Sequence, residues 1–130
     1  MIDIMKKIIE LGELYKRGEF DKCISEISEI WDSLPDPKET VPNSYLLVEY
    51  GARISLAKKD YVKAWEWANV SLKYNDIRNR MGEGEFLLGI VSFAKGDVEN
   101  AKKYFAIANE KSEGRAFEGA NISQYKKLLV

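Results

Sequence analysis

Few side chains in this sequence are of the types that do covalent or metal chemistry. The 130 residues contain one cysteine, Cys23, and no histidine. A catalytic thiol needs a neighbouring base and an electropositive pocket, and zinc needs several cysteine and histidine ligands. Cys23 stands among apolar residues at helical spacing, so we expect it to be a buried packing residue. We also expect no metal and no cofactor.

Three glutamates, Glu49, Glu83 and Glu85, are the carboxylates that could pair for acid–base catalysis. In a chain with 32% charged residues, however, acids on a solvated helix face are the better explanation. The run from Gly82 to Gly89 has the glycines of a nucleotide-binding loop, but the third fingerprint glycine would fall at Leu87 and no strand precedes it. We therefore expect a protein that is not an enzyme.

The charge balance and the apolar runs exclude further classes of function. Lys and Arg total 20 against 21 acids, and the two signs are interspersed, so we expect no nucleic-acid partner. Charges interrupt every apolar run before the roughly 18 residues that a membrane span needs, so we expect no membrane segment. With a single cysteine and no signal-peptide pattern at the start, a cytoplasmic location is predicted.

Apolar residues recur at three and four along most of the chain, which predicts amphipathic helices and no strand. Prolines at 35, 37 and 42 mark a loop, and the polar stretch from Asn75 to Gly82 marks a second one. Asp60 is expected to cap the helix that follows it. The predicted helices cover about 4–15, 20–34, 43–58, 61–74, 86–93, 98–108 and 115–129.

A heptapeptide pattern occurs three times, each time between two predicted helices. The three copies are the segments 17–23, 58–64 and 95–101. Each contains, in order, a Gly or Lys that ends the first helix, an acid, an aromatic residue or Val, and a Cys or Ala. A supersecondary unit that recurs in this way predicts a stack of helix pairs in which each unit contacts only its neighbours.

The third unit resembles the tetratricopeptide repeat, a helix-turn-helix unit of about 34 residues. Its matching residues are Leu88, Gly89, Gly96, Ala101, Phe105 and Ala108. The first unit matches through Leu11, Gly12, Tyr15, Gly18, Phe20 and Pro35. The second keeps Tyr61 and Ala64, but it has Ala52 at the glycine position and Ala68 at the position of the large aromatic residue.

This resemblance implies one all-α domain over residues 1–130. The units would lie at about 4–35, 43–76 and 81–113, and a capping helix at about 115–129 would close the array. The expected architecture is a right-handed α-α superhelix of about seven helices.

The family binds a peptide or a partner helix in a concave groove lined by the first helix of each pair. The resemblance therefore implies a non-enzymatic protein-interaction module, such as a small adaptor, co-chaperone or assembly subunit, whose partner is a protein or peptide. The positions in this chain that correspond to the groove are Tyr15, Lys16, Glu49, Tyr50, Arg53, Glu83, Phe86, Ile90 and Phe93. For the aromatic residues among them, packing between helices is an equally good explanation.

The fourth predicted helix has a second apolar stripe, formed by Trp67, Val70 and Tyr74. Two explanations stay open. Trp67 can pack beneath the following helix or the long loops, or it can centre an exposed surface that binds a partner or a second copy of the chain. The second explanation supports an alternative function, a self-associating structural or assembly protein. A nucleic-acid regulator or an enzyme fits the sequence less well.

Overall fold

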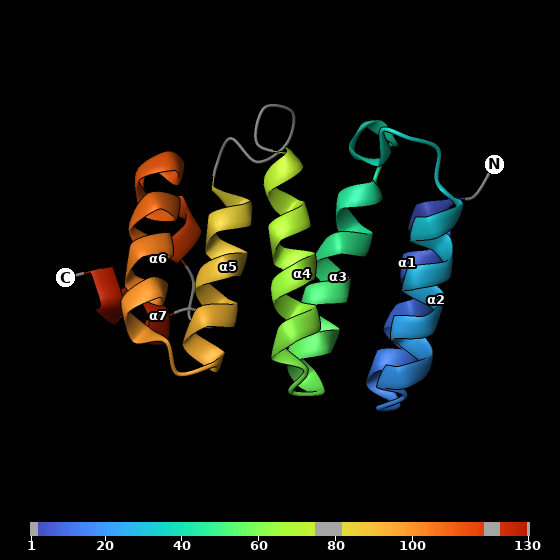
Figure 1. Ribbon diagram of the computed structural model, residues 1–130, viewed down its shortest axis with the longest axis horizontal. Coiled ribbons are helices and arrows are strands. Elements are labelled where there is room, and N and C mark those ends of the chain that lie inside the picture. The colour runs from blue at the N-terminus through green and yellow to red at the C-terminus, as the bar shows by residue number, and fades with distance from the viewer. Residues whose placement is uncertain (1–2, 75–81, 119–122, 130) are drawn as a thin grey trace. The chain divides into compact units, whose positions relative to one another are not determined.

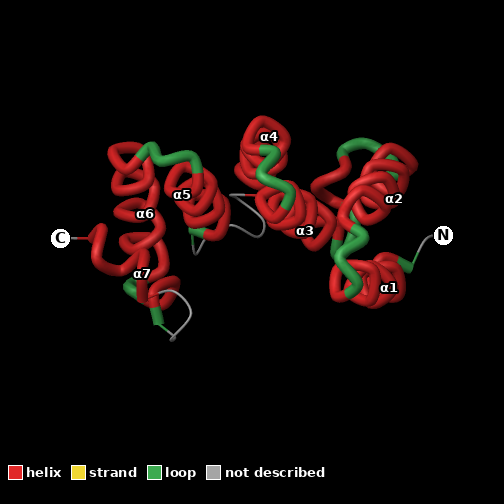
Figure 2. Tube along the Cα trace, turned by 90° about the horizontal axis from the view of Figure 1, so that it is seen from below, coloured by secondary structure: helices red, strands yellow, loops and turns green. Residues whose placement is uncertain are grey.

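The computed structural model describes residues 3–74, 82–118 and 123–129, and every regular element in these ranges is helical (Figures 1 and 2). The all-α prediction is confirmed for these ranges. The α-helices are α1 (Ile4–Lys16), α2 (Phe20–Ser33), α3 (Ser44–Ala57), α4 (Tyr61–Ser71), α5 (Glu83–Ala94), α6 (Val98–Ser112) and α7 (Ser123–Lys126). Short 3-10 turns are η1 (Lys38–Thr40), η2 (Leu72–Tyr74), η4 (Arg115–Phe117) and η6 (Lys127–Leu129).

The helices gather into two compact units, and the boundary between them falls within α4. The first unit is Met1–Trp67 and the second is Ala68–Val130. The organisation as one domain with three repeat units stays a prediction. The expected unit ends at 76 and 81 lie outside the described residues, as does the predicted turn between them.

The three copies of the heptapeptide form the same backbone turn. Gly18, Lys59 and Gly96 are left-handed, with φ of 76°, 63° and 85°. Each donates its N–H to the carbonyl three residues earlier, and the next residue donates to the carbonyl five residues before it, at 2.8–3.0 Å. This paired bonding satisfies the free carbonyls at the end of a helix, and it is the Schellman motif. The sequence repeat is therefore a structural repeat.

The acid after the turn caps the second helix of two of the three pairs. Asp60 accepts a hydrogen bond from the N–H of Lys63 at 3.1 Å, and Asp97 accepts one from the N–H of Asn100 at 3.2 Å. The cap predicted at Asp60 is thus confirmed. Glu19, the equivalent acid before α2, makes no side-chain cap. Its longer side chain matches the cap geometry less well than aspartate does.

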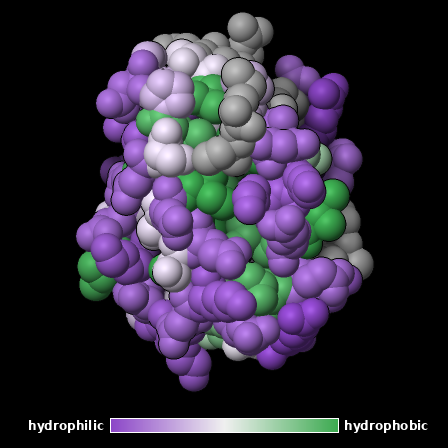
Figure 3. Space-filling view, turned by 90° about the vertical axis from the view of Figure 1, so that its right-hand side faces the viewer, coloured by the Kyte–Doolittle hydropathy of each residue, from purple (hydrophilic) through white to green (hydrophobic). Residues whose placement is uncertain are grey.

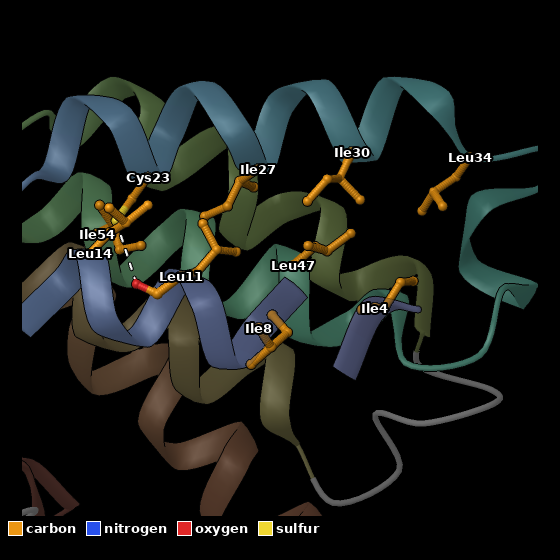
Figure 4. Close-up of a cluster of buried hydrophobic side chains, with 10 residues drawn as sticks. All are labelled: Ile4, Ile8, Leu11, Leu14, Cys23, Ile27, Ile30, Leu34, Leu47 and Ile54. Carbon is orange, nitrogen blue, oxygen red and sulfur yellow. Dashed lines mark hydrogen bonds between the residues drawn. The ribbon is translucent and has the colours of Figure 1, made fainter. Parts of the chain in front are cut away.

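Apolar side chains of α1, α2 and α3 form the core of the first unit (Figure 4). Cys23 is fully buried in this core, as the sequence predicts, and its thiol donates a 3.7 Å hydrogen bond to the carbonyl of Leu11. The core residues are Ile4, Ile8, Leu11, Leu14, Cys23, Ile27, Ile30, Leu34, Leu47 and Ile54.

Helix α5 is the most deeply buried helix described in the second unit. Its eight buried residues run from Gly84 to Ser92 with only Phe86 left partly exposed, so it has little solvent-facing surface. The expectation of a solvated helix face is wrong for Glu85, whose carboxylate is almost completely buried and is paired with the ammonium group of Lys111 on α6. Because a buried charge needs an opposite charge close by, this pair holds α5 and α6 together in one register.

The C-terminal segment differs from the single capping helix expected over 115–129. The structure has the 3-10 turn η4, then Glu118 in an extended conformation (φ −85°, ψ 135°), and later the four residues of α7 followed by η6. An extended residue breaks the helical hydrogen-bond ladder, so the apolar periodicity here reflects packing of short turns rather than one helix. Residues 119–122 of the expected helix lie outside the described residues.

Candidate binding surface

Helix α3 brings three of the predicted groove residues together. The face of α3 opposite its exposed side chains is buried and its flanks are partly buried. The exposed side chains Glu49, Arg53 and Ala57 follow one another at four-residue spacing. Arg53 Nε donates to Glu49 Oε1 at 3.2 Å, while Tyr50 beside them is partly buried against the core of the first unit. We call Glu49, Tyr50 and Arg53 the α3 surface.

The α3 surface combines a fixed backbone with adaptable polar groups. Because α3 is packed on both flanks, its exposed stripe is held in place without a partner. The Glu49–Arg53 ion pair is about half exposed, so its net contribution to stability is small. The pair can therefore exchange for charged groups of a ligand at low cost, and the guanidinium has further N–H donors to offer.

The two predicted groove residues of α1 lie near its C-terminal end. Tyr15 is 44% exposed, and its ring centre lies 5.3 Å from that of Phe20 on α2. Lys16 is exposed and lies 3.7 Å from the carboxylate of Glu13 on the same helix. Both side chains are accessible, and neither is part of the buried core.

In the second unit, the predicted groove aromatics pack against the chain itself. The ring centre of Phe86 lies 5.2 Å from that of Phe117 and 6.1 Å from that of Tyr125, and Phe93 lies 5.3 Å from Tyr125. Ile90 is buried, so Glu83 is the exposed member of the four positions on α5. The C-terminal segment thus occupies the aromatic face of α5.

Trp67 packs inside the first unit. Its indole lies so close to Gly51 that a Cβ there would be 2.6 Å from it, and its ring meets that of Trp31 edge-on at 5.8 Å. Trp67 and Val70 are partly buried and Tyr74 is 4% exposed. The packing partners of Trp67 on α2 and α3 are not those that the sequence suggested, since they precede it in the chain.

The large hydrophobic side chains that are exposed in the described part of the chain include two that sequence reasoning missed, Met5 and Ile9. They lie four residues apart on α1, away from the stripe of Ile4, Ile8 and Leu11. The sequence contained a signal for them, because Met5 and Ile9 form a second apolar stripe on α1. A helix that packs on its core through one stripe leaves a second stripe exposed. The remaining exposed ones are Tyr15, Val62 and Val98.

Among the described residues, two titratable groups have perturbed pKa values, and both changes have structural causes. Burial raises the pKa of the Cys23 thiol, and the negative charges of Glu26 and Glu19 add to the rise. Hydrogen bonds from Asn100 lower the pKa of Asp97, the cap of α6. A protonated thiol is a poor nucleophile, so the chemistry at Cys23 is that of a packing residue.

The described residues include neither a cluster of metal-binding side chains nor a helix able to span a membrane. Within residues 3–74, 82–118 and 123–129, no three or more side chains of the metal-binding types Cys, Asp and Glu gather closely enough to hold an ion. None of the helices in these ranges combines the length and apolar character that crossing a membrane requires.

Comparisons with protein families, with curated proteins and with solved structures find no match for this chain. The resemblance to tetratricopeptide repeats therefore remains an expectation drawn from the residues.

Proposed function

We propose that this chain is a non-enzymatic protein-interaction module of the cytoplasm, an adaptor, co-chaperone or assembly subunit arranged as a tetratricopeptide-like superhelix. It holds a peptide or a helix of a partner protein on the α3 surface. The observation that carries the proposal is the exposed Glu49–Arg53 pair beside Tyr50, on a helix whose opposite face is buried and whose flanks are partly buried.

The residue types of the α3 surface support a role in recognition. Tyrosine and arginine are enriched among the residues that dominate binding energy at protein interfaces. A helix whose flanks are already packed loses little conformational freedom when a ligand binds, and this favours affinity. The repeated Schellman turns support a stacked array, because they join all three helix pairs in the same way.

The charges define the chemistry of the expected ligand. Arg53 would bind an acidic side chain of the partner, and Glu49 would accept hydrogen bonds from its backbone amides or from a basic side chain. In the second unit, Phe117 and Tyr125 already cover the aromatic residues of α5. The proposal therefore places the binding site on the first unit.

A site-specific cross-linking experiment tests this function. A photoreactive amino acid at position 53 in the full chain should trap a partner from native lysate, and the same group at Lys22 serves as the control. Lys22 is also an exposed cation on a helix of the first unit, but it lies outside the α3 surface. Arg53→Ala should weaken capture by the untethered protein about tenfold or more, whereas Lys22→Ala should not. Equal trapping at both positions would contradict the proposal.

A further inference from the structure

Helix α1 has an apolar stripe on its solvent-exposed side, in addition to the stripe that packs on the core. Ile9 is 68% exposed and Met5 is 46% exposed, one helical turn apart. Gly12 continues this stripe by three residues, and a Cβ there would meet nothing within 4 Å. Figure 3 looks onto the side of the first unit that α1 and α2 form, where apolar surface lies between hydrophilic side chains. Stacked helical units usually cover such an end face with polar residues.

Two opposite charges border the stripe in a self-complementary order. Lys6 and Glu13 are seven residues apart, so both lie on the same side of α1, about 10 Å apart along its axis. Ile9 lies near the midpoint between them. If a second α1 packs antiparallel about a two-fold axis near Ile9, Lys6 of each copy faces Glu13 of the other. A parallel two-fold arrangement would instead place Lys6 and Glu13 of the two copies on opposite sides of the interface, where they could not pair.

We propose that the stripe of Met5, Ile9 and Gly12, bordered by Lys6 and Glu13, is an isologous interface on which α1 of a second copy of this chain packs antiparallel. The apolar stripe supplies the buried surface, and the charge order sets the direction. Gly12 has no side chain, which lets the two backbones approach closely. The net charge of −1 opposes association only weakly. This interface is separate from the α3 surface, so either can fail without the other.

Sedimentation equilibrium of the full chain tests the proposal. The wild type should be a dimer at high concentration, and Ile9→Glu should raise the dissociation constant about a hundredfold, because a symmetric dimer contains the substitution twice. Val62→Glu is the matched control, since Val62 is 70% exposed on α4 and outside the stripe. It should leave the dissociation constant unchanged, and circular dichroism should show that both variants are folded.

Charge reversal tests the antiparallel direction. Lys6→Glu alone and Glu13→Lys alone should each weaken the dimer by about tenfold, because each creates two like-charge pairs. The double variant Lys6→Glu, Glu13→Lys should restore the wild-type constant. A wild-type chain that stays monomeric up to about 1 mM would overturn the proposal. The proposal would also be overturned if Ile9→Glu and Val62→Glu changed the dissociation constant equally. A double variant that dimerises no more tightly than the single variants would overturn it as well.

Discussion

The ring of Phe105 on α6 lies directly against the backbone of Gly89 on α5. A Cβ at residue 89 would be 2.5 Å from Phe105 Cδ1, closer than real side chains approach. The same relationship joins Trp67 and Gly51 in the first unit, where the corresponding distance is 2.6 Å. Both pairs are separated by 16 residues, 51 to 67 and 89 to 105. Each unit thus uses a glycine to let one helix receive a large ring from the next.

Gly89→Ala should lower the free energy of unfolding by about 1–2 kcal/mol. Alanine favours a helix over glycine by about 1 kcal/mol, but an added methyl group against a fixed ring costs about 1–3 kcal/mol or more. Chemical denaturation monitored by circular dichroism measures the difference.

Gly12→Ala is the matched control for this substitution. A Cβ at Gly12 has free space within the chain, so at concentrations where the chain is monomeric the helix preference alone should act and raise stability by about 0.5–1 kcal/mol. If both glycine substitutions changed stability in the same direction, the close approach of Phe105 to Gly89 would not be a real constraint.

The Gly51–Trp67 pair differs in register from what the resemblance to tetratricopeptide repeats implies for the second unit. The family pattern puts the glycine and the aromatic residue at 52 and 68, where this chain has alanines that are both buried. The actual pair lies one residue earlier at each end, so the contact is kept while both pattern positions fail. The spacing of apolar residues cannot reveal this change of register. Positions 52 and 68 stay apolar in both registers, and only the contact between the glycine and the aromatic ring moves to 51 and 67.

Helix positions followed from the sequence because local signals determine them. The turns at Gly18, Lys59 and Gly96 and the cap at Asp60 depend on neighbouring residues alone. Contacts between distant segments were not predictable in the same way. The sequence leaves Phe86 and Phe93 either in an open groove or packed between helices, and in the structure Phe117 and Tyr125 pack against them. Nothing in the spacing of α5 shows that a segment about 30 residues later returns to it.

The left-handed residue at the second turn is a lysine, and this should cost stability. A non-glycine residue at φ 63° is disfavoured by about 1 kcal/mol relative to glycine. Lys59→Gly should therefore stabilise the protein by about 1 kcal/mol, with no change in the helix content. Thermal melting gives the comparison.

The reverse substitution at the equivalent position of the third turn is the control. Gly96→Ala should destabilise by about 1 kcal/mol, because φ is 85° there although a Cβ would meet nothing within 4 Å. A neutral Gly96→Ala together with a neutral Lys59→Gly would show that the turns relax freely, contrary to this account.

The Glu85–Lys111 pair should matter more than exposed ion pairs do. Lys111→Ala removes the ammonium group from a carboxylate that is buried on α5, and we expect a loss of about 1–3 kcal/mol. Lys102→Ala, at an exposed position of the same helix, should change stability by less than about 0.5 kcal/mol. Urea denaturation of the three proteins at neutral pH checks this, and a Lys111→Ala variant as stable as Lys102→Ala would exclude a structural role for the pair.

Burial of Cys23 predicts both its reactivity and a pH dependence. The raised pKa keeps the folded thiol protonated, so reaction with a thiol reagent at pH 8 should require opening of the first unit. In the unfolded chain the thiol ionises near pH 8.5. The stabilisation from this group is therefore present below about pH 8.5 and is lost as the pH rises through the higher folded-state pKa. Cys23→Ala should lack this alkaline loss, and rapid labelling of the folded wild type would contradict the buried position.

The docking of the C-terminal segment depends on Tyr125, whose ring contacts those of Phe86, Phe93 and Phe105. Tyr125→Ala should lower the free energy of unfolding by about 1–3 kcal/mol, because it removes three ring contacts from a partly buried site.

The Tyr125→Ala substitution should also expose the aromatic face of α5 and increase binding of the dye ANS. Lys126→Ala, at the exposed neighbouring position, should change neither the stability nor the dye binding. Proteolysis after residue 118 should become faster in Tyr125→Ala alone if the ring holds the segment in place. Unchanged cleavage and dye binding in that variant would mean that Phe117 is sufficient to hold the segment.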